Sequence, residues 1–241
     1  MSRKVDFITF CHPPHLEKLH APGVLEEMLE SHRYPFNAIH VIHQRCRGIP
    51  YRPLEGVHIH ESEDYPNVLG NFGINPDNPQ AERMTHGPGA SHYWKWHCIN
   101  HLIGLVVTKA DHVVFSDCDC LMKRNDSPTW VLEGLDYLSK HGRCLVVSPN
   151  DGSDERNTQN MSQQLFLCNV HRFRSLNFDL PFLGFDAPGG PMQEYYWMLE
   201  GRIGRIMQRF NYHRRVLDEK HRYWHYNPWE PTGWLESTKN R

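Results

Sequence analysis

Short apolar runs alternate with helical patterns in the first sixty residues. Residues 5–10, 38–43 and 57–60 are rich in β-branched and aromatic side chains, which is typical of strands. Between the first two runs, apolar positions from 15 to 32 recur at nearly helical spacing, interrupted by Pro22-Gly23, and predict a turn followed by a helix that Pro22 starts. This order predicts an α/β layer with a mainly parallel sheet.

The middle of the chain changes character twice. Residues 61–89 are crowded with Gly, Pro and Asn and predict a long loop, which in a compact domain is usually functional or mobile. Residues 90–110 are apolar around most of a helical circumference and predict a buried helix. That helix leads directly into Val113-Val114-Phe115, a predicted central strand.

The second half continues the alternation. Residues 130–140 predict a helix that ends near Gly142, and 193–210 predict another. Residues 144–148, 164–169 and 223–226 predict strands. Polar or Gly/Pro-rich loops are expected at 149–161 and 182–192.

Two acids close the central strand. Asp117 and Asp119 follow Phe115 directly, and in extended backbone residues i and i+2 point to the same side. Two carboxylates this close repel each other unless a cation or a donor lies between them, and Mg²⁺ or Mn²⁺ prefers such oxygen ligands. The alternative is a polar exit from a strand, with Asp119 capping a turn. We favour a metal–phosphate site.

Bulk composition excludes several classes of protein. The 241 residues are 39% hydrophobic and 22% charged with a net charge of −2, which describes a globular protein of one domain or two closely joined halves. No basic surface for nucleic acid or an anionic membrane is expected. No apolar run is long enough to cross a bilayer, and the N-terminal apolar run is too short for a signal peptide. We therefore expect a cytoplasmic protein, or one trimmed of its anchor.

Cysteine and histidine are scattered. The seven cysteines form no Cys-x-x-Cys pair and are expected to be buried and reduced. Several of the 18 histidines have ligand-like spacing, namely His12/His15, His40/His43, His58/His60 and His97/His101. None of these pairs adjoins a cysteine pair or a His-Glu-x-x-His sequence, so no structural zinc site is predicted.

With these features the chain resembles the nucleotide-sugar-dependent glycosyltransferases of the GT-A fold. The resemblance lies in a first strand with a polar end at 5–12, the Ser116-Asp-Cys-Asp119 strand end, a Gly-rich loop ahead of Glu194, and a late histidine, His225. It implies a single compact GT-A domain, Rossmann-like, with a mixed, mainly parallel sheet flanked by helices. Residues 1–122 would bind the nucleotide-sugar and 123–241 the acceptor.

The same resemblance implies a divalent metal, Mn²⁺ or Mg²⁺, which neutralises the leaving diphosphate. Asp119 corresponds to the metal ligand, and Asp117 to a ribose contact or a residue next to the metal. His225 corresponds to a C-terminal metal ligand. Its alternative is membership of an aromatic cluster with Tyr223, Trp224, Tyr226 and Trp229.

Cationic and strand-end residues are the candidates for the donor. Arg83 and Lys95 precede the central strand and could contact the diphosphate, or they are a loop charge and a solvated helix position. Thr9, Phe10 and His12 end the first strand, where open α/β sheets bind ligands.

An inverting transfer needs a carboxylate to take the proton of the acceptor hydroxyl. Glu194 stands where inverting relatives carry that base, and Asp186 is its competitor. This chain has Gln193-Glu194 where many such relatives show two acids, and the alternative role of Glu194 is to complement a helix N-terminus.

The leading hypothesis is thus a metal-dependent glycosyltransferase of the hexosyltransferase type. It would move a sugar from a nucleotide diphosphate, UDP in preference to GDP, to a glycan or small hydroxyl acceptor. A nucleotidyltransferase is an alternative, although Cys11-His-Pro-Pro-His15 replaces the Gly-rich basic loop expected after its first strand. A non-catalytic carbohydrate- or metal-binding protein is the third reading.

Overall fold

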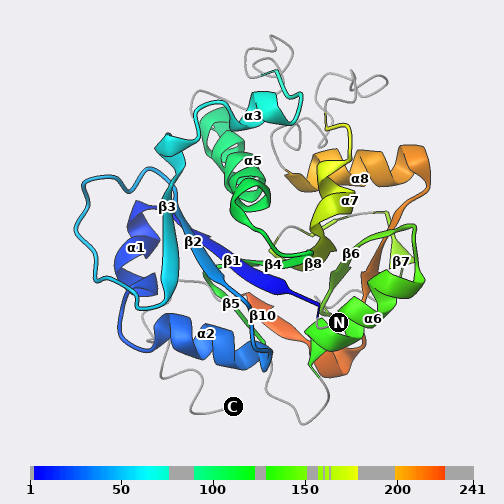
Figure 1. Cartoon of the computed structure of the whole chain (residues 1–241), viewed down its shortest axis with the longest axis horizontal. Coiled ribbons are helices and arrows are strands. Elements are labelled where there is room, and N and C mark those ends of the chain that lie inside the picture. Colours follow the sequence, from blue (N-terminus) through cyan, green and yellow to red (C-terminus); the bar gives the residue numbers. More distant parts are fainter. Residues whose placement is uncertain are drawn as a thin grey trace.

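An eight-stranded mixed sheet connects both halves of the chain, in the order β3-β2-β1-β4-β8-β6-β9-β7 (Figure 1). The strands are β1 (Val5–Cys11), β2 (Ile39–His43), β3 (Val57–Glu61), β4 (His112–Asp117), β6 (Cys144–Ser148), β7 (Asn157–Thr158), β8 (Leu165–Asn169) and β9 (His213–Val216). The computed structural model describes residues 3–75, 90–122, 129–150, 157–159, 161–162, 164–178 and 199–225, without the side chains of 90–97 and 224–225.

Parallel pairing dominates the first half of the sheet. Strands β3, β2, β1 and β4 pair in parallel, and so do β6 and β9. Strand β8 is antiparallel to both β4 and β6, and β7 is antiparallel to β9. The predicted α/β fold, with a mixed and mainly parallel sheet flanked by helices, is confirmed.

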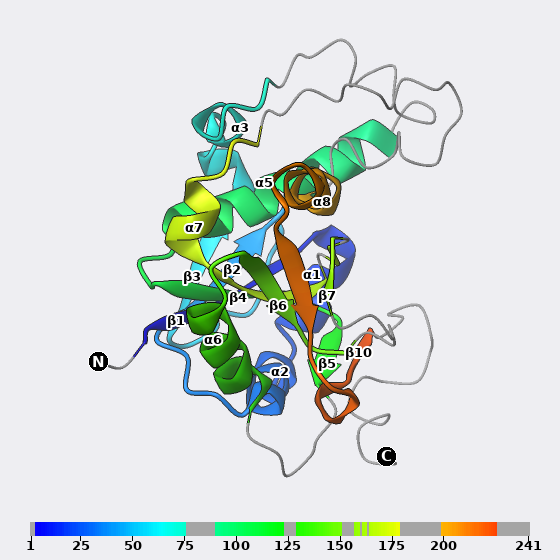
Figure 2. The ribbon, with the colours of Figure 1, turned by 90° about the vertical axis from the view of Figure 1, so that its right-hand side faces the viewer.

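Helices cover both faces of this sheet. In Figures 1 and 2, α5 (Ala90–Val107), α7 (Val170–Arg174) and α8 (Leu199–Phe210) lie on one face, and α2 (Val24–His32) and α6 (Trp130–Lys140) lie on the other. The further helical segments are α1 (Pro13–Leu19), α3 (Val68–Asn71), η1 (Ser62–Asp64) and η3 (Glu219–His221).

The alternation of β1 shows how the two cores are divided. Ile8 and Phe10 belong to the core under α5 and α8, whereas Phe7 and Cys11 belong to the core under α1, α2 and α6. Every residue of β1 is buried, as expected for a central strand covered on both faces.

Local sequence explains where individual helices begin. Gly23 adopts a left-handed φ of 81° before α2, so the Pro22-Gly23 break ends with Gly23 and the helix starts at Val24. The helix α6 begins after Thr129, whose side chain accepts a hydrogen bond from the Leu132 N–H.

Several predicted elements are confirmed with close bounds, among them α5, α6, β6 and β8. The structure differs at several places. A turn was expected ahead of a helix started by Pro22, but helix α1 forms from Pro13, because proline is tolerated in the first helical turn, and the next helix starts only at Val24. Within the predicted loop, η1 and α3 form. Strand β9 was not predicted, because its sequence His-Arg-Arg-Val lacks apolar alternation. The strand at Cys120–Met122, strand β7 and helix α7 were not predicted either.

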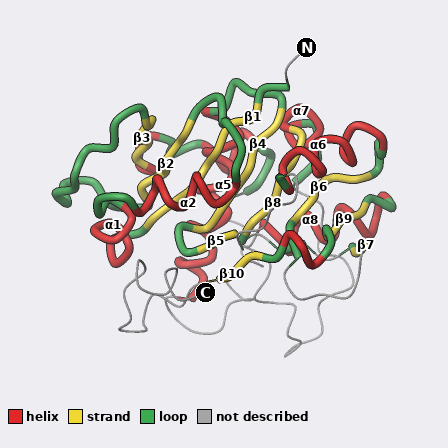
Figure 3. Tube along the Cα trace, turned by 90° about the horizontal axis from the view of Figure 1, so that it is seen from below, coloured by secondary structure: helices red, strands yellow, loops and turns green. Residues whose placement is uncertain are grey.

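A second, two-stranded sheet extends beyond the end of β4. It pairs β5 (Cys120–Met122) antiparallel with β10 (Tyr223–His225), and Figure 3 shows the two strands side by side. The late strand predicted from the sequence is therefore present, but it joins this small sheet. Among the described helices, none combines the length and apolarity needed to cross a bilayer.

Candidate functional site

The acidic pair lies at the carboxyl edge of the parallel strands. Asp117 is the last residue of β4 and stands opposite Phe10 of β1, while its backbone N–H donates to the Gln164 carbonyl at 2.7 Å. This is the edge at which open α/β sheets bind ligands. The location agrees with the expectation from the sequence.

The Asp117 carboxylate has one buried oxygen atom with no described partner. Its Oδ1 is buried and has no hydrogen-bond partner among the described residues. Burial raises the pKa of Asp117 well above its usual range, and the negative charges of Asp119 and Glu200 raise that pKa further. A buried, unpaired acid of this kind requires an explanation, such as an ion bound there in the working protein.

Asp119 lies in a turn and not in the strand. Strand β4 ends at Asp117, and Cys118 and Asp119 form the turn that leads into β5. We had expected extended backbone between the two carboxylates, but a turn connects them. Their charges nevertheless interact, as the pKa of Asp117 shows.

Two histidines at the start of α1 lie near the acidic turn. Burial lowers the pKa of His12 to about 4, the charge of His15 lowers it further, and the charge of Asp119 opposes this. The rings of His12 and His15 lie 4.1 Å apart, and His15 Nδ1 is 3.5 Å from the Cys118 thiol. His15 Nε2 is buried without a hydrogen-bond partner in the described part of the chain.

The backbone of His225 lies next to the acidic turn. In the small sheet His225 pairs with Cys120, the residue that follows Asp119. Directly paired antiparallel residues have Cα atoms about 4.5–5.5 Å apart. The fold therefore brings together two segments separated by more than a hundred positions, as the resemblance implied.

A hard divalent cation fits the donor set of this edge. Asp117 and Asp119 offer oxygen atoms, Glu200 adds a third negative charge, and one of the oxygens is buried and unpaired. Mg²⁺ and Mn²⁺ prefer such ligands. The observation that supports the fit is the unpaired Oδ1 of Asp117.

The remaining donor candidates on β1 have different surroundings. Thr9 is fully buried, and its Oγ1 has no hydrogen-bond partner among the described residues. Phe10 is buried, and its ring packs edge-on against His101 at 4.6 Å. His12 is half-buried at the start of α1.

Five candidates fall wholly or partly outside the described structure. Arg83, Asp186 and Glu194 lie outside the described residues. Lys95 belongs to α5 and His225 to β10, but their side chains also lie outside the described part. Their roles stay predictions.

Sequence reasoning missed Glu200 and His15. Glu200 lies in the first turn of α8, six residues after Glu194, and its sequence surroundings give no sign that its charge acts on Asp117. His15 was noticed only for its spacing from His12. That spacing of three places both rings on one side of the first helical turn, which was a usable signal.

Comparison with known proteins adds a similarity in fold. No family model matches the chain, and no curated protein matches it either. Among solved structures, mouse xyloside xylosyltransferase 1 in its apo form is similar with 11% identity and a TM-score of 0.47, covering 90% of this chain and 86% of that chain. The galactosyltransferase LgtC, solved with donor and acceptor sugar analogues, has 13% identity and a TM-score of 0.34, covering 70% and 59%.

Both neighbours are glycosyltransferases by name. At this identity and TM-score neither supplies a substrate or a residue role for this chain, so its function is inferred from the acidic edge itself.

Proposed function

We propose that this protein is a metal-dependent glycosyltransferase that transfers a sugar from a nucleotide diphosphate donor, with UDP as the nucleotide, to a hydroxyl acceptor. The proposal depends on one observation: the buried and unpaired Oδ1 of Asp117 at the carboxyl edge, next to the charges of Asp119 and Glu200. Ionised acids held in this way are stabilised by a cation, and a diphosphate is its natural further ligand.

Asp119 and Asp117 would hold Mn²⁺ or Mg²⁺, with His225 as a third ligand from the paired strand β10. When bound, the ion neutralises the charge that develops on the leaving diphosphate. The chain itself positions the donor. Phe10 pairs with Asp117 across β1 and β4 and is buried in the core beneath α5, so it would support the strand ends on which the donor lies.

Neutral histidine is the second element of the proposal. Because the pKa of His12 is lowered to about 4, its imidazole is uncharged at neutral pH and can both donate and accept hydrogen bonds. Such a group suits the hydroxyls of a ribose or sugar. We assign His12 to donor binding on this basis.

The acceptor side rests on the sequence alone. Residues 1–122 would bind the donor and 123–241 the acceptor, with Glu194 as the base and Asp186 as its competitor. Arg83 and Lys95 would contact the diphosphate. A Glu194→Gln variant that keeps donor binding and loses transfer would support the base assignment.

Thermal denaturation with UDP-sugars, with and without Mn²⁺, tests the metal and the donor together. We expect stabilisation that requires both, and its loss in Asp119→Ala. Asp136→Ala is the matched control, because Asp136 is an exposed acid paired only with Lys140 among the interactions described for it. Metal-dependent stabilisation that persists in Asp119→Ala would contradict the proposal.

The released product separates the two enzyme classes. A glycosyltransferase releases UDP from a UDP-sugar, whereas a nucleotidyltransferase forms or consumes pyrophosphate. Turnover that releases pyrophosphate and no UDP would favour the alternative.

A further inference from the structure

A second group of metal-ligating side chains lies on the other face of the same sheet edge. Cys11, His20 and His43 present one sulfur and two nitrogen atoms that all lie within 4.8 Å of one another. All three residues are buried, with exposed fractions of 2%, 3% and 0%. They do not form a metal-binding motif in the sequence, because they come from three different elements, namely β1, the end of α1 and β2.

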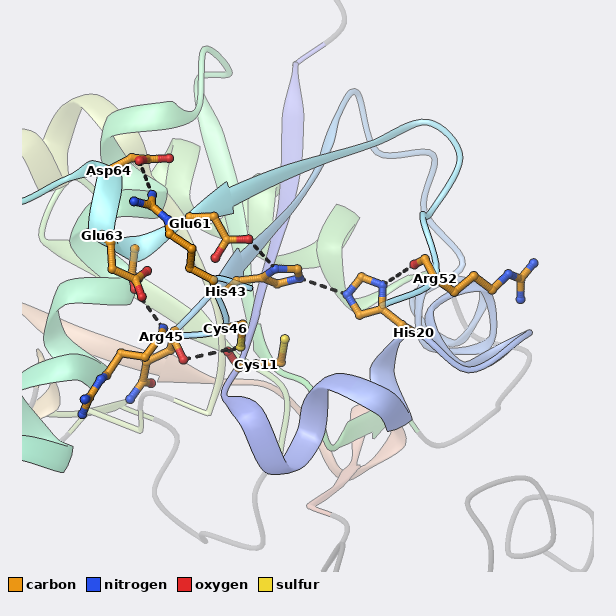
Figure 4. Close-up of polar contacts among 12 residues, drawn as sticks. Cys11, His20, His43, Arg45, Cys46, Arg52, Glu61, Glu63 and Asp64 are labelled. Carbon is orange, nitrogen blue, oxygen red and sulfur yellow. Dashed lines mark hydrogen bonds and ion pairs between the residues drawn. The ribbon is translucent and has the colours of Figure 1, made fainter. Parts of the chain in front are cut away.

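Strand register explains how they meet. Cys11 pairs with His43 across β1 and β2, and His43 pairs with Glu61 across β2 and β3. Cys11, His43 and Glu61 thus form a row at the ends of three parallel strands. His20 completes the group from the residue that ends α1 (Figure 4).

The outer nitrogens of both histidines are fixed as donors. His20 Nδ1 lies 2.7 Å from the Arg52 carbonyl oxygen, which can only accept a hydrogen bond. His43 Nδ1 lies 3.0 Å from Glu61 Oε1, which accepts when the carboxylate is ionised. Each neutral ring has one N–H, so both Nε2 atoms then carry a lone pair.

These two Nε2 atoms face each other at 3.0 Å, as the dashed lines of Figure 4 show. Two lone pairs at that distance repel, so a positive centre must lie between or beside them. Two nitrogens bound to one tetrahedral zinc at about 2.0–2.1 Å lie about 3.3 Å apart. A small displacement of one ring would bring the pair to that separation.

We propose that Cys11, His20 and His43 bind a zinc ion. A thiolate and two imidazoles are a ligand set that zinc favours over the hard ions of an acidic site. The outer contacts match the usual support of such ligands, in which a carboxylate and a backbone carbonyl orient the histidine rings. Here Glu61 and the Arg52 carbonyl fill these roles.

Tyr51 closes the site toward solvent. The Tyr51 ring lies 4.7 Å from that of His20 and 4.6 Å from that of His43, and the residue is 38% exposed. The zinc would tie the ends of β1, β2 and α1 together, and the inference stands independently of the proposed transferase activity.

Cobalt substitution tests the site, because a thiolate bound to Co²⁺ gives a charge-transfer band that oxygen ligands do not. The reduced wild-type protein is titrated with Co²⁺ in the presence of excess Mg²⁺, which occupies acidic sites. We expect a band that saturates at one ion per chain and disappears when Zn²⁺ is added. A folded wild-type protein with no such band would overturn the proposal, whatever the variants do.

Two cysteine variants locate the thiolate. Cys11→Ser should lose the band, and Cys118→Ser, which removes the other thiol that contacts a histidine, should keep it. A band that survives in Cys11→Ser, or is lost in Cys118→Ser alone, would overturn the assignment. Circular dichroism confirms that each variant is folded.

Two further measurements test the contact of Glu61 with His43 and the competing explanation for the histidine pair. Glu61→Gln should weaken Co²⁺ binding about 10–100-fold while leaving the band in place at saturation. A proton shared by His20 and His43 is the competing explanation. Imidazole ¹⁵N resonances of these residues that do not change when Zn²⁺ is added would show that explanation to be correct and the zinc proposal wrong.

Discussion

Replacing Asp117 with asparagine should stabilise the metal-free protein while it abolishes the response to Mn²⁺. The substitution keeps the size of the side chain and removes one charge. Asp117 carries a buried oxygen without a hydrogen-bond partner in the described structure, and the pKa of this acid is raised by burial and by the charges of Asp119 and Glu200. In the absence of a cation, its ionised form therefore opposes folding.

The size of the effect follows from Coulomb's law. At an effective dielectric constant of about 20, two unit charges at an assumed separation of about 7 Å would repel by about 2 kcal/mol. The charges of Asp119 and Glu200 both act on Asp117, and protonation of this acid already relieves part of the repulsion. We expect the free energy of unfolding to rise by about 1–3 kcal/mol, which for a chain of this size raises the Tm by roughly 3–9 °C.

The assay is thermal and urea denaturation at neutral pH, in chelator and then with Mn²⁺. Wild type should gain stability with Mn²⁺, and Asp117→Asn should start higher and gain none. Asp111→Asn, at an exposed acid just before the same strand, should leave both values unchanged within about 0.5 kcal/mol. A destabilised Asp117→Asn protein, or one that still responds to Mn²⁺, would refute the reasoning.

Three further predictions concern the fold. Burial lowers the pKa of His32 to about 3, so only the unfolded chain binds its proton between pH 6.5 and 3, and stability is lost as the pH falls. The free energy of unfolding should fall by about 2 kcal/mol between pH 6.5 and 5. His32→Asn should reduce the dependence of this free energy on pH, as measured by urea denaturation at several pH values. Gly104→Ala should cost about 1–3 kcal/mol, since its Cβ would lie 2.5 Å from Phe115 Cε1, whereas Gly142→Ala, with open space, should be nearly neutral by the same denaturation assay. Thr129→Ala removes the cap of α6 and should lower the free energy of unfolding by about 0.5–2 kcal/mol, and an unchanged midpoint would speak against the cap.

Sequence patterns predicted the layers of this fold because burial and period are local properties. Strand β4 was recognisable from Val113-Val114-Phe115, and its acids from their position at its end. Strand β9 was not recognisable, because Arg214 is buried there and its charged neighbours hide the strand period. Pairing with β6 and β7, which the local sequence does not encode, makes it a strand.

The two candidate sites differ in how far the local sequence reveals them. Asp117 and Asp119 are neighbours in sequence, so their proximity could be predicted. Cys11 and His43 meet only because β1 and β2 pair in one particular register, and their separation of more than thirty residues resembles no metal motif. The expectation that no zinc site exists was drawn from spacing alone, and spacing does not report register.

Alternation along β1 explains how one strand end serves two kinds of site. Phe10 faces the core beneath α5 and pairs with Asp117, whereas Cys11 faces the core beneath α1 and α2 and pairs with His43. Adjacent residues of a strand point to opposite faces, so Asp117, which pairs with Phe10, and Cys11 are directed to opposite sides of the sheet. A zinc ion bound to Cys11 would also restrict the backbone of Phe10, and with it the edge at which the donor is proposed to bind.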